Sequence, residues 1–133
     1  MAYQSFEDLE VWQRGCRLSV AIFEAFETCK RFTLRDQIER AGLSVPSNIA
    51  EGAERGSSKD FAHFLNFSKG SCGELRTQLY IARKLNELDT TNFNSLMRES
   101  REISAMLQGL RRSLLRKAVT KQSGDAGRLK LNS

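Results

Sequence analysis

The chain has 133 residues and a net charge of +5 at pH 7, which is the length of one domain with a continuous hydrophobic core. Hydrophobic residues make up 40% and charged residues 28%, and no uncharged apolar run approaches the roughly 18 residues that a membrane span requires. Three cysteines without a CxxC pair and an acidic, polar start favour a cytoplasmic protein with free thiols and exclude a disulfide framework.

The first predicted helix covers residues 6–29. Ser5 and Asp8 have the spacing of a capping box, with Ser5 as the N-cap. Apolar and small residues then recur at intervals of three and four: Leu9, Trp12, Cys16, Ser19, Phe23 and Phe26. A second apolar stripe follows beside the first: Val11, Leu18, Ile22 and Ala25. This extra apolar surface either fills a wide core or faces another subunit, and its width favours self-association.

The second predicted helix starts after Thr33, a suitable N-cap, and carries the only proline of the chain. Its apolar stripe stays in phase across Pro46: Leu34, Ile38, Ala41, Val45 and Ile49. The pattern therefore predicts one helix kinked at Pro46 rather than two short helices. Proline removes the N–H that would bond the carbonyl of Gly42, and its ring crowds that carbonyl.

The polar members of the motif around this proline are Asn48, Glu51 and Gly52. Asn48 and Glu51 are three residues apart and share a helical face. One interpretation is structural: the side chains bond backbone groups freed by Pro46, or they fix the turn that follows. The alternative is a role in a subunit contact or a ligand pocket.

The third predicted helix opens with a second capping-box spacing, Ser57 and Asp60. Its stripe is regular: Phe61, Leu65, Ser68, Cys72, Leu75, Leu79 and Ala82. Small residues at Gly70 and Gly73 predict a close crossing with the second helix, so leucine at either position should destabilise the fold.

Thr91 or Asn92 is the expected cap of the fourth helix. The stripe that follows consists of Phe93, Leu96, Ser100, Ile103, Leu107, Leu110 and Leu114. From about Ala118 the pattern dissolves, which predicts a bundle over residues 5–117 and a disordered basic tail over 118–133. Four helices of similar length joined by short turns predict an all-α, antiparallel up-down-up-down four-helix bundle.

Three motifs carry a family resemblance over roughly residues 5–90. The segment FEDLEVWQ at residues 6–13 resembles the "DLxVWQ" opening of the four-helix-bundle family encoded in intervening sequences of bacterial 23S ribosomal RNA genes. Residues 37–52 resemble its "QIRRAxxSIPANIAEG" core, with Glu39 where the family usually has arginine, and residues 64–79 match its "FLNxAxGSxxELxTQL" pattern.

The resemblance implies a cytoplasmic four-helix bundle that assembles as a homopentameric ring. The function of this family is not settled. A related bundle, which does not share these motifs, is the accessory protein of diversity-generating retroelements, where a basic ring engages nucleic acid and a reverse transcriptase.

The residue types in the sequence give little support for a catalytic function. His63 is the only histidine, and the sequence contains neither a metal-ligand cluster nor a phosphate-binding glycine loop. We therefore expect no enzyme activity, cofactor or metal, and a partly exposed structural role for His63. Cys16 and Cys72 lie on core stripes and are expected to be small buried groups.

The positive charge is concentrated at the C-terminal end. Residues 1–110 hold 14 Lys/Arg against 15 Asp/Glu, whereas the last 23 residues hold seven basic side chains and one acidic one, Asp125. The seven are Arg111, Arg112, Arg116, Lys117, Lys121, Arg128 and Lys130. One explanation of these cations is structural, because positive charge at the C-terminal end of a helix complements the helix dipole. The alternative is phosphate binding by a salt-sensitive basic segment.

No aromatic residue interrupts this segment, so base stacking is not indicated there and binding should be indifferent to sequence. A membrane surface is excluded as partner because the segment has no Trp or Phe to insert. The leading hypothesis is a non-enzymatic homo-oligomer that binds RNA or DNA, with RNA favoured. The alternative is a structural scaffold whose partner is another protein, such as a reverse transcriptase.

Overall fold

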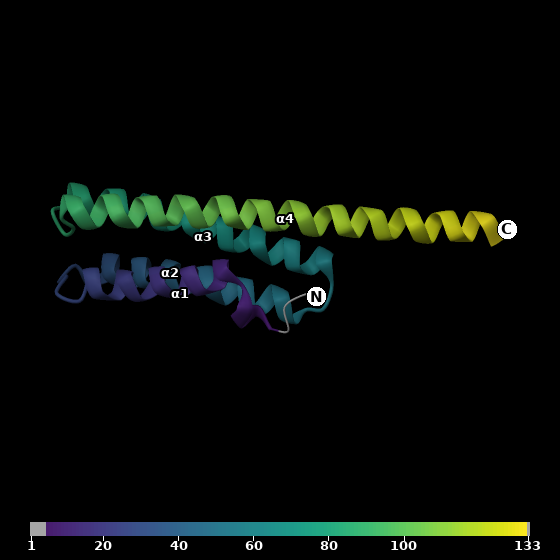
Figure 1. Cartoon of the computed structure of the whole chain (residues 1–133). Helices are drawn as coiled ribbons and strands as arrows, with labels where there is room; N and C mark the ends of the chain where they lie inside the picture. The colour runs from purple at the N-terminus through teal and green to yellow at the C-terminus, as the bar shows by residue number, and fades with distance from the viewer. Residues whose placement is uncertain (1–4, 133) are drawn as a thin grey trace.

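The computed structural model describes the backbone of residues 5–132 and the side chains of residues 5–120. A 3-10 turn, η1 (Phe6–Asp8), precedes four α-helices: α1 (Glu10–Ala25), α2 (Phe32–Glu54), α3 (Ser58–Lys84) and α4 (Thr90–Asn132). The helices α1 and α3 each pack against both α2 and α4. The loops that join α1 to α2 and α3 to α4 lie at one end of the molecule, and the loop from α2 to α3 lies at the other (Figure 1). The predicted all-α four-helix fold is confirmed.

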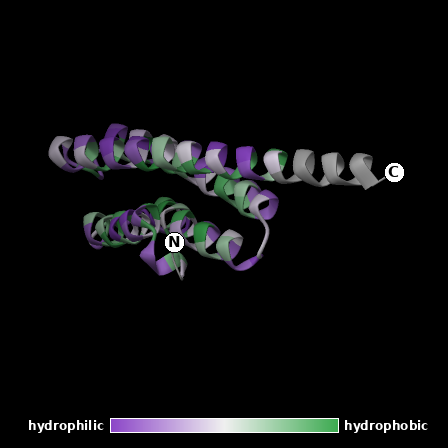
Figure 2. Ribbon diagram, turned by 45° about the vertical axis from the view of Figure 1, so that its right-hand side comes forward, coloured by the Kyte–Doolittle hydropathy of each residue, from purple (hydrophilic) through white to green (hydrophobic). Residues whose placement is uncertain are grey.

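One apolar core runs along the interior of the bundle. Its largest fully buried side chains are Phe26, Leu18, Ile22, Ile38, Ile49, Leu65, Leu75, Leu79, Ile103, Leu107, Val45 and Cys72. Every member of the predicted α3 stripe is buried, and so are most members of the α2 and α4 stripes. Hydrophobic and hydrophilic residues recur along each helix in Figure 2, as the three-and-four spacing requires.

The first helix differs from its prediction in its start and in its buried face. The Ser5 hydroxyl accepts a hydrogen bond from the Glu7 N–H (3.2 Å), but it caps only the turn η1, and α1 begins at Glu10. The buried side chains come from both stripes, Val11, Leu18 and Ile22 from the second and Ser19 and Phe26 from the first, whereas Phe23 is 39% exposed. The second stripe therefore fills the core together with part of the first.

The second helix is continuous through Pro46, so the prediction of one helix rather than two is confirmed. The kink itself stays a prediction. Pro46 is buried against α1 at Gly15, where an added Cβ would lie 3.4 Å from the proline Cβ. The Asn48 amide donates to the Ser44 carbonyl (2.8 Å), not to that of Gly42, and the Glu51 carboxylate pairs with Arg55 (3.1 Å).

The closest approach of α2 and α3 is at Gly52, and the prediction that Gly70 and Gly73 permit it is wrong. A Cβ added at Gly52 would lie 2.6 Å from the Phe64 Cβ, whereas nothing lies within 4 Å of a Cβ added at Gly70 or Gly73. Both glycines lie on parts of the α3 surface that face away from α2. The Ser68 hydroxyl strengthens the true crossing by donating to the Val45 carbonyl (2.7 Å).

Short polar side chains cap the N-terminal ends of α3 and α4. Ser57 caps α3 as predicted, because its hydroxyl accepts from the Asp60 N–H (3.1 Å). At α4 the cap is Asp89 rather than Thr91 or Asn92, since the Asp89 carboxylate accepts from the Asn92 N–H (2.7 Å).

The helix α4 continues to Asn132, where the sequence predicts a disordered tail from residue 118. Extending a helix that is already formed costs less than nucleating one, so loss of the apolar pattern need not end it. The side chains of residues 121–133 lie outside the described part of the chain, and the division into bundle and tail stays a prediction.

The Gly52 contact generates a stability prediction. We expect Gly52→Ala to lower the free energy of unfolding by about 1–3 kcal/mol, because the methyl group would overlap Phe64. Gly70→Ala is the matched control and should be neutral or stabilising by up to about 1 kcal/mol, since alanine favours the helix and meets nothing. Urea denaturation measures both, and equal stability of the two variants would contradict the packing argument.

Candidate nucleic-acid interface

The predicted basic residues all lie on α4, which runs past the ends of the other three helices (Figure 1). Arg112, Arg116 and Lys117 are exposed, and Arg111 is partly buried, with its Nε lacking a hydrogen-bond partner. The side chains of Lys121, Arg128 and Lys130 lie outside the described residues. We call residues 111–130 the C-terminal basic segment.

The position of this segment bears on the helix-dipole explanation. Because α4 ends at Asn132, residues Arg111 to Lys117 stand in its interior rather than in its last turn. The favourable interaction of a cation with the dipole falls off within the last turn. The helix dipole therefore does not account for these four cations.

Ion pairs divide the molecule into two sides. Among the described side chains, the basic partners are Arg14, Arg31, Arg35 and Arg55, which belong to α1, to α2 or to residues next to α2. Within the same set, the cations of α3 and α4 have no carboxylate partner. These cations are Lys59, Lys69, Arg76, Arg83, Lys84, Arg98, Arg101, Arg111, Arg112, Arg116 and Lys117.

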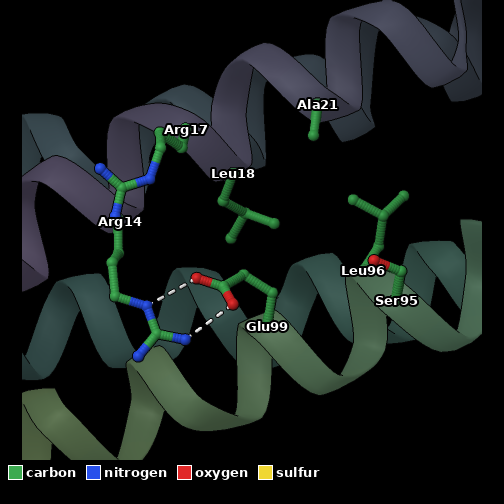
Figure 3. Close-up of a pocket in the computed structure, with 7 residues that line it drawn as sticks. All are labelled: Arg14, Arg17, Leu18, Ala21, Ser95, Leu96 and Glu99. Atoms are coloured by element: carbon green, nitrogen blue, oxygen red, sulfur yellow. Dashed lines mark hydrogen bonds and ion pairs between the residues drawn. The ribbon is translucent and has the colours of Figure 1, made fainter.

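The strongest ion pair joins α1 to α4. Arg14 donates two hydrogen bonds to the Glu99 carboxylate, at 2.8 and 2.7 Å (Figure 3). Its guanidinium also lies 3.5 Å from the Glu102 carboxylate. The hydrogen bond from Arg14 lowers the pKa of Glu99 and raises that of Arg14. Since Glu99 and Glu102 are the only carboxylates between residues 90 and 120, α4 directs its negative charge toward α1.

Three cations of α3 contact α4 through neutral groups, among them Lys69 and Arg76. Lys69 donates to the Gln108 side-chain oxygen (2.9 Å), and Arg76 donates to the hydroxyls of Ser100 (3.1 Å) and Ser104 (3.2 Å). Neutral acceptors leave the positive charge uncompensated. Sequence reasoning missed these residues because charge was summed along the chain. The signal was the seven-residue spacing of Lys69 and Arg76 without a carboxylate on the same stripe.

The groups that could support other chemistry are dispersed. His63 is exposed and contacts the Phe67 ring at 4.5 Å between ring centres. Cys16, Cys29 and Cys72 are free thiols, and burial raises the pKa of each. Over the described residues no group of His, Cys, Asp and Glu could hold a metal ion. None of the described helices is both long enough and apolar enough to cross a bilayer.

An apolar groove lies between α1 and α2, on the side of the bundle away from α3. It has a volume of about 380 Å³ and is lined by Cys16, Ser19, Val20, Phe23, Glu24, Leu43 and Pro46. Val20, Phe23 and Leu43 are 56%, 39% and 49% exposed, which makes this the surface where the predicted α1 stripe emerges. The Ser19 hydroxyl in it is buried and has no hydrogen-bond partner.

Comparison with known proteins places this fold. The family model described as "23S rRNA-intervening sequence protein" matches residues 7–109. The chain belongs to this family. The match confirms the family that the three sequence motifs indicate, and it ends just before the C-terminal basic segment. No curated protein matches the chain.

A solved structure shares the fold. It is a protein of unknown function from the S23 ribosomal protein family of Bacteroides thetaiotaomicron VPI-5482, with a TM-score of 0.72 and 24% sequence identity. The alignment covers 75% of this chain and 96% of that one. At this identity the likeness establishes the fold alone. About a quarter of the chain therefore lies outside the shared bundle.

The Arg14–Glu99 pair predicts a pH-dependent contribution to stability. Because the pKa of Glu99 is lowered on folding, the pair stabilises the protein above the ordinary carboxyl pKa of about 4.3 and stops doing so as the pH falls through the lowered value. We expect Glu99→Gln to cost about 1 kcal/mol at pH 7, discounted for partial exposure, and nothing once Glu99 is protonated in the wild type.

The matched control is Glu51→Gln, which removes an exposed pair with Arg55 on one helix and should cost at most about 0.5 kcal/mol. Thermal unfolding at pH 7 and at progressively lower pH measures both variants. A Glu99→Gln penalty that stays constant down to pH 2 would contradict the assignment.

Proposed function

We propose that the protein is a non-enzymatic, cytoplasmic nucleic-acid-binding protein, with RNA as the favoured ligand. The C-terminal basic segment supplies the main contact with phosphates. The observation that carries the proposal is the absence of carboxylate partners for the described cations of α3 and α4. A cation that is already ion-paired exchanges one anion for another on binding phosphate, whereas an unpaired one gains an interaction and releases counterions.

Exposure and placement support the same conclusion. Arg112, Arg116 and Lys117 are exposed on a helix that passes beyond the rest of the bundle, so a strand of nucleic acid can reach them without displacing packed groups. The contacts are charge–phosphate contacts. We therefore expect binding that depends on salt and is indifferent to base sequence.

The first test replaces Arg112, Arg116 and Lys117 together by glutamine. RNA affinity measured by fluorescence anisotropy should fall, and the slope of log affinity against log salt should decrease by about 2, since each lost single-strand phosphate contact removes about 0.7. The matched control replaces Arg17, Lys30 and Arg40, three exposed cations of the α1 and α2 side that also lack ion pairs.

The control changes the net charge by the same amount and should leave most of the affinity and the slope intact. Equal loss in both triple variants would mean that overall charge alone attracts the RNA. Absence of binding by the wild type at low salt would remove the proposal and favour the alternative, a scaffold for a protein partner.

We propose in addition that the chain self-associates, as the pentameric rings of its family resemblance imply, through the apolar groove between α1 and α2. The groove supports this proposal because Val20, Phe23 and Leu43 expose apolar surface beside a buried hydroxyl that has no hydrogen-bond partner among the described residues. An exposed contiguous apolar surface of this kind favours an interface. A second protein, such as a reverse transcriptase, is the alternative occupant.

Leu43→Glu tests the groove. The charge would have to be buried in an apolar contact, so we expect light scattering after gel filtration to show a shift to smaller species, with helix content unchanged. Thr77→Glu places the same charge on an exposed position of α3 and is the control. If neither variant alters a wild-type oligomer, the interface lies elsewhere. A monomeric wild type would leave the groove to a different protein.

A further inference from the structure

We propose that the outer face shared by α3 and α4 binds single-stranded nucleic acid, with a base stacked on Tyr80. This inference rests on the proposed function and extends it to the structural class of the ligand. It places a stacking contact within the bundle, outside the C-terminal basic segment, at a residue that the sequence motifs do not single out.

The first observation is the stripe on which Tyr80 lies. Lys69, Gly73, Arg76, Tyr80 and Lys84 follow one another at intervals of four, three, four and four, so they share one side of α3. The contacts of Lys69 with Gln108 and of Arg76 with Ser104 show that this side borders α4. Tyr80 is 55% exposed between the two cations Arg76 and Lys84. The stripe contains no carboxylate.

The second observation is that α4 continues the same face. Ser104 and Gln108 of α4 are among the residues that contact this stripe, and Arg101 and Arg112 extend their series by three residues before and four after. Both arginines are exposed. Tyr80 therefore belongs to a surface whose charged members on two helices are all positive.

The third observation is where the nearby carboxylates are held. Glu74 accepts a hydrogen bond from Gln78 (3.3 Å), and Gln78 lines a cavity together with Leu34 and Gln37 of α2. The two carboxylates of α4 are directed to Arg14 on α1. Negative charge is thus turned toward α1 and α2, which leaves the α3–α4 face free to accept phosphates.

An exposed ring within such a face has a specific use. The Lys84 ammonium lies over one face of the Tyr80 ring, 5.4 Å from its centre, so a base would stack on the opposite face or displace the ammonium toward its own neighbouring phosphate. Stacking on an aromatic side chain requires a base free of its neighbours, as in a single strand, and it tolerates any base. The geometry therefore points to single strands rather than duplexes.

The chain offers a matched control in Phe67. It is 48% exposed on the same helix, but it lies in the series Phe67, Ser71, Glu74 and Gln78, which contains a carboxylate and borders α2. Its ring packs on Phe64 at 5.6 Å between ring centres, and the nearby Arg55 is paired with Glu51. An aromatic ring without the positive surroundings should contribute nothing to binding.

The experiment uses the full chain and fluorescence anisotropy with a labelled RNA of mixed, non-self-complementary sequence, single-stranded or annealed to its complement. Tyr80→Ala should weaken single-strand binding by about 5- to 100-fold and leave the salt slope unchanged, because stacking is not a charge interaction. Tyr80→Phe keeps the ring and should retain wild-type affinity. Phe67→Ala should match the wild type, and circular dichroism checks the fold of each variant.

The outcomes separate this inference from the proposed function. Wild-type RNA binding that Tyr80→Ala leaves unchanged would overturn the stacking site and preserve the role of the C-terminal basic segment. Equal affinity for single strand and duplex would overturn it as well. Loss of single-strand affinity in Phe67→Ala equal to that in Tyr80→Ala would assign the effect to general apolar surface. Absence of all wild-type binding would remove both proposals.

Discussion

The packing of residues 44–52 of α2 against α1 and α3 is the constraint on which the bundle depends. Pro46 lies buried against Gly15, and Gly52 lets the backbone of α2 approach Phe61 and Phe64. Next to the proline, the Ser68 hydroxyl donates a hydrogen bond to the Val45 carbonyl at 2.7 Å. A proline weakens the helix that contains it, so this segment must gain from its neighbours what it loses internally. Close contacts on both sides supply that gain, and they fix α1 and α3 relative to α2.

The position of α4 follows from a different interaction. Arg14 makes a bidentate ion pair with Glu99 and lies 3.5 Å from Glu102, so both carboxylates are on the α1 side of α4. The Arg14 side chain is 19% exposed. In this orientation of α4, Ser104 and Gln108 lie against the cations Lys69 and Arg76 of α3. This ion pair therefore contributes to the orientation of α4 and places its carboxylates on the α1 side. Among the described side chains, four of the seven cations along α1 and α2 are ion-paired, whereas none of those along α3 and α4 is.

The sequence predicted most of the fold because each helix carries an apolar stripe and short turns leave few ways to connect four helices. It could not decide how the core is shared between the two stripes of α1, since Val11, Leu18 and Ile22 are spaced as regularly as the stripe that includes Trp12 and Phe23. It also placed the close helix crossing at Gly70, because small residues signal close approach only when the neighbour is known. The Arg14–Glu99 pair joins positions far apart in the chain, so no local spacing could indicate it.

The boundary of the family match divides the positive side into two parts with different physical demands. The matched residues 7–109 include Lys69, Arg76 and Tyr80, which lie on α3, and another face of this helix builds part of the core. Their positions depend on the packing of that core, because a shift in the register of α3 would turn these side chains toward it. The C-terminal basic segment begins after residue 109 and runs along a helix that passes beyond the bundle. Charge can be added to that projection with little effect on the core. A bundle limited to the matched region would keep the α3 stripe and lose the projection, so under the proposed function it would keep the stacking site and lose the main phosphate contacts.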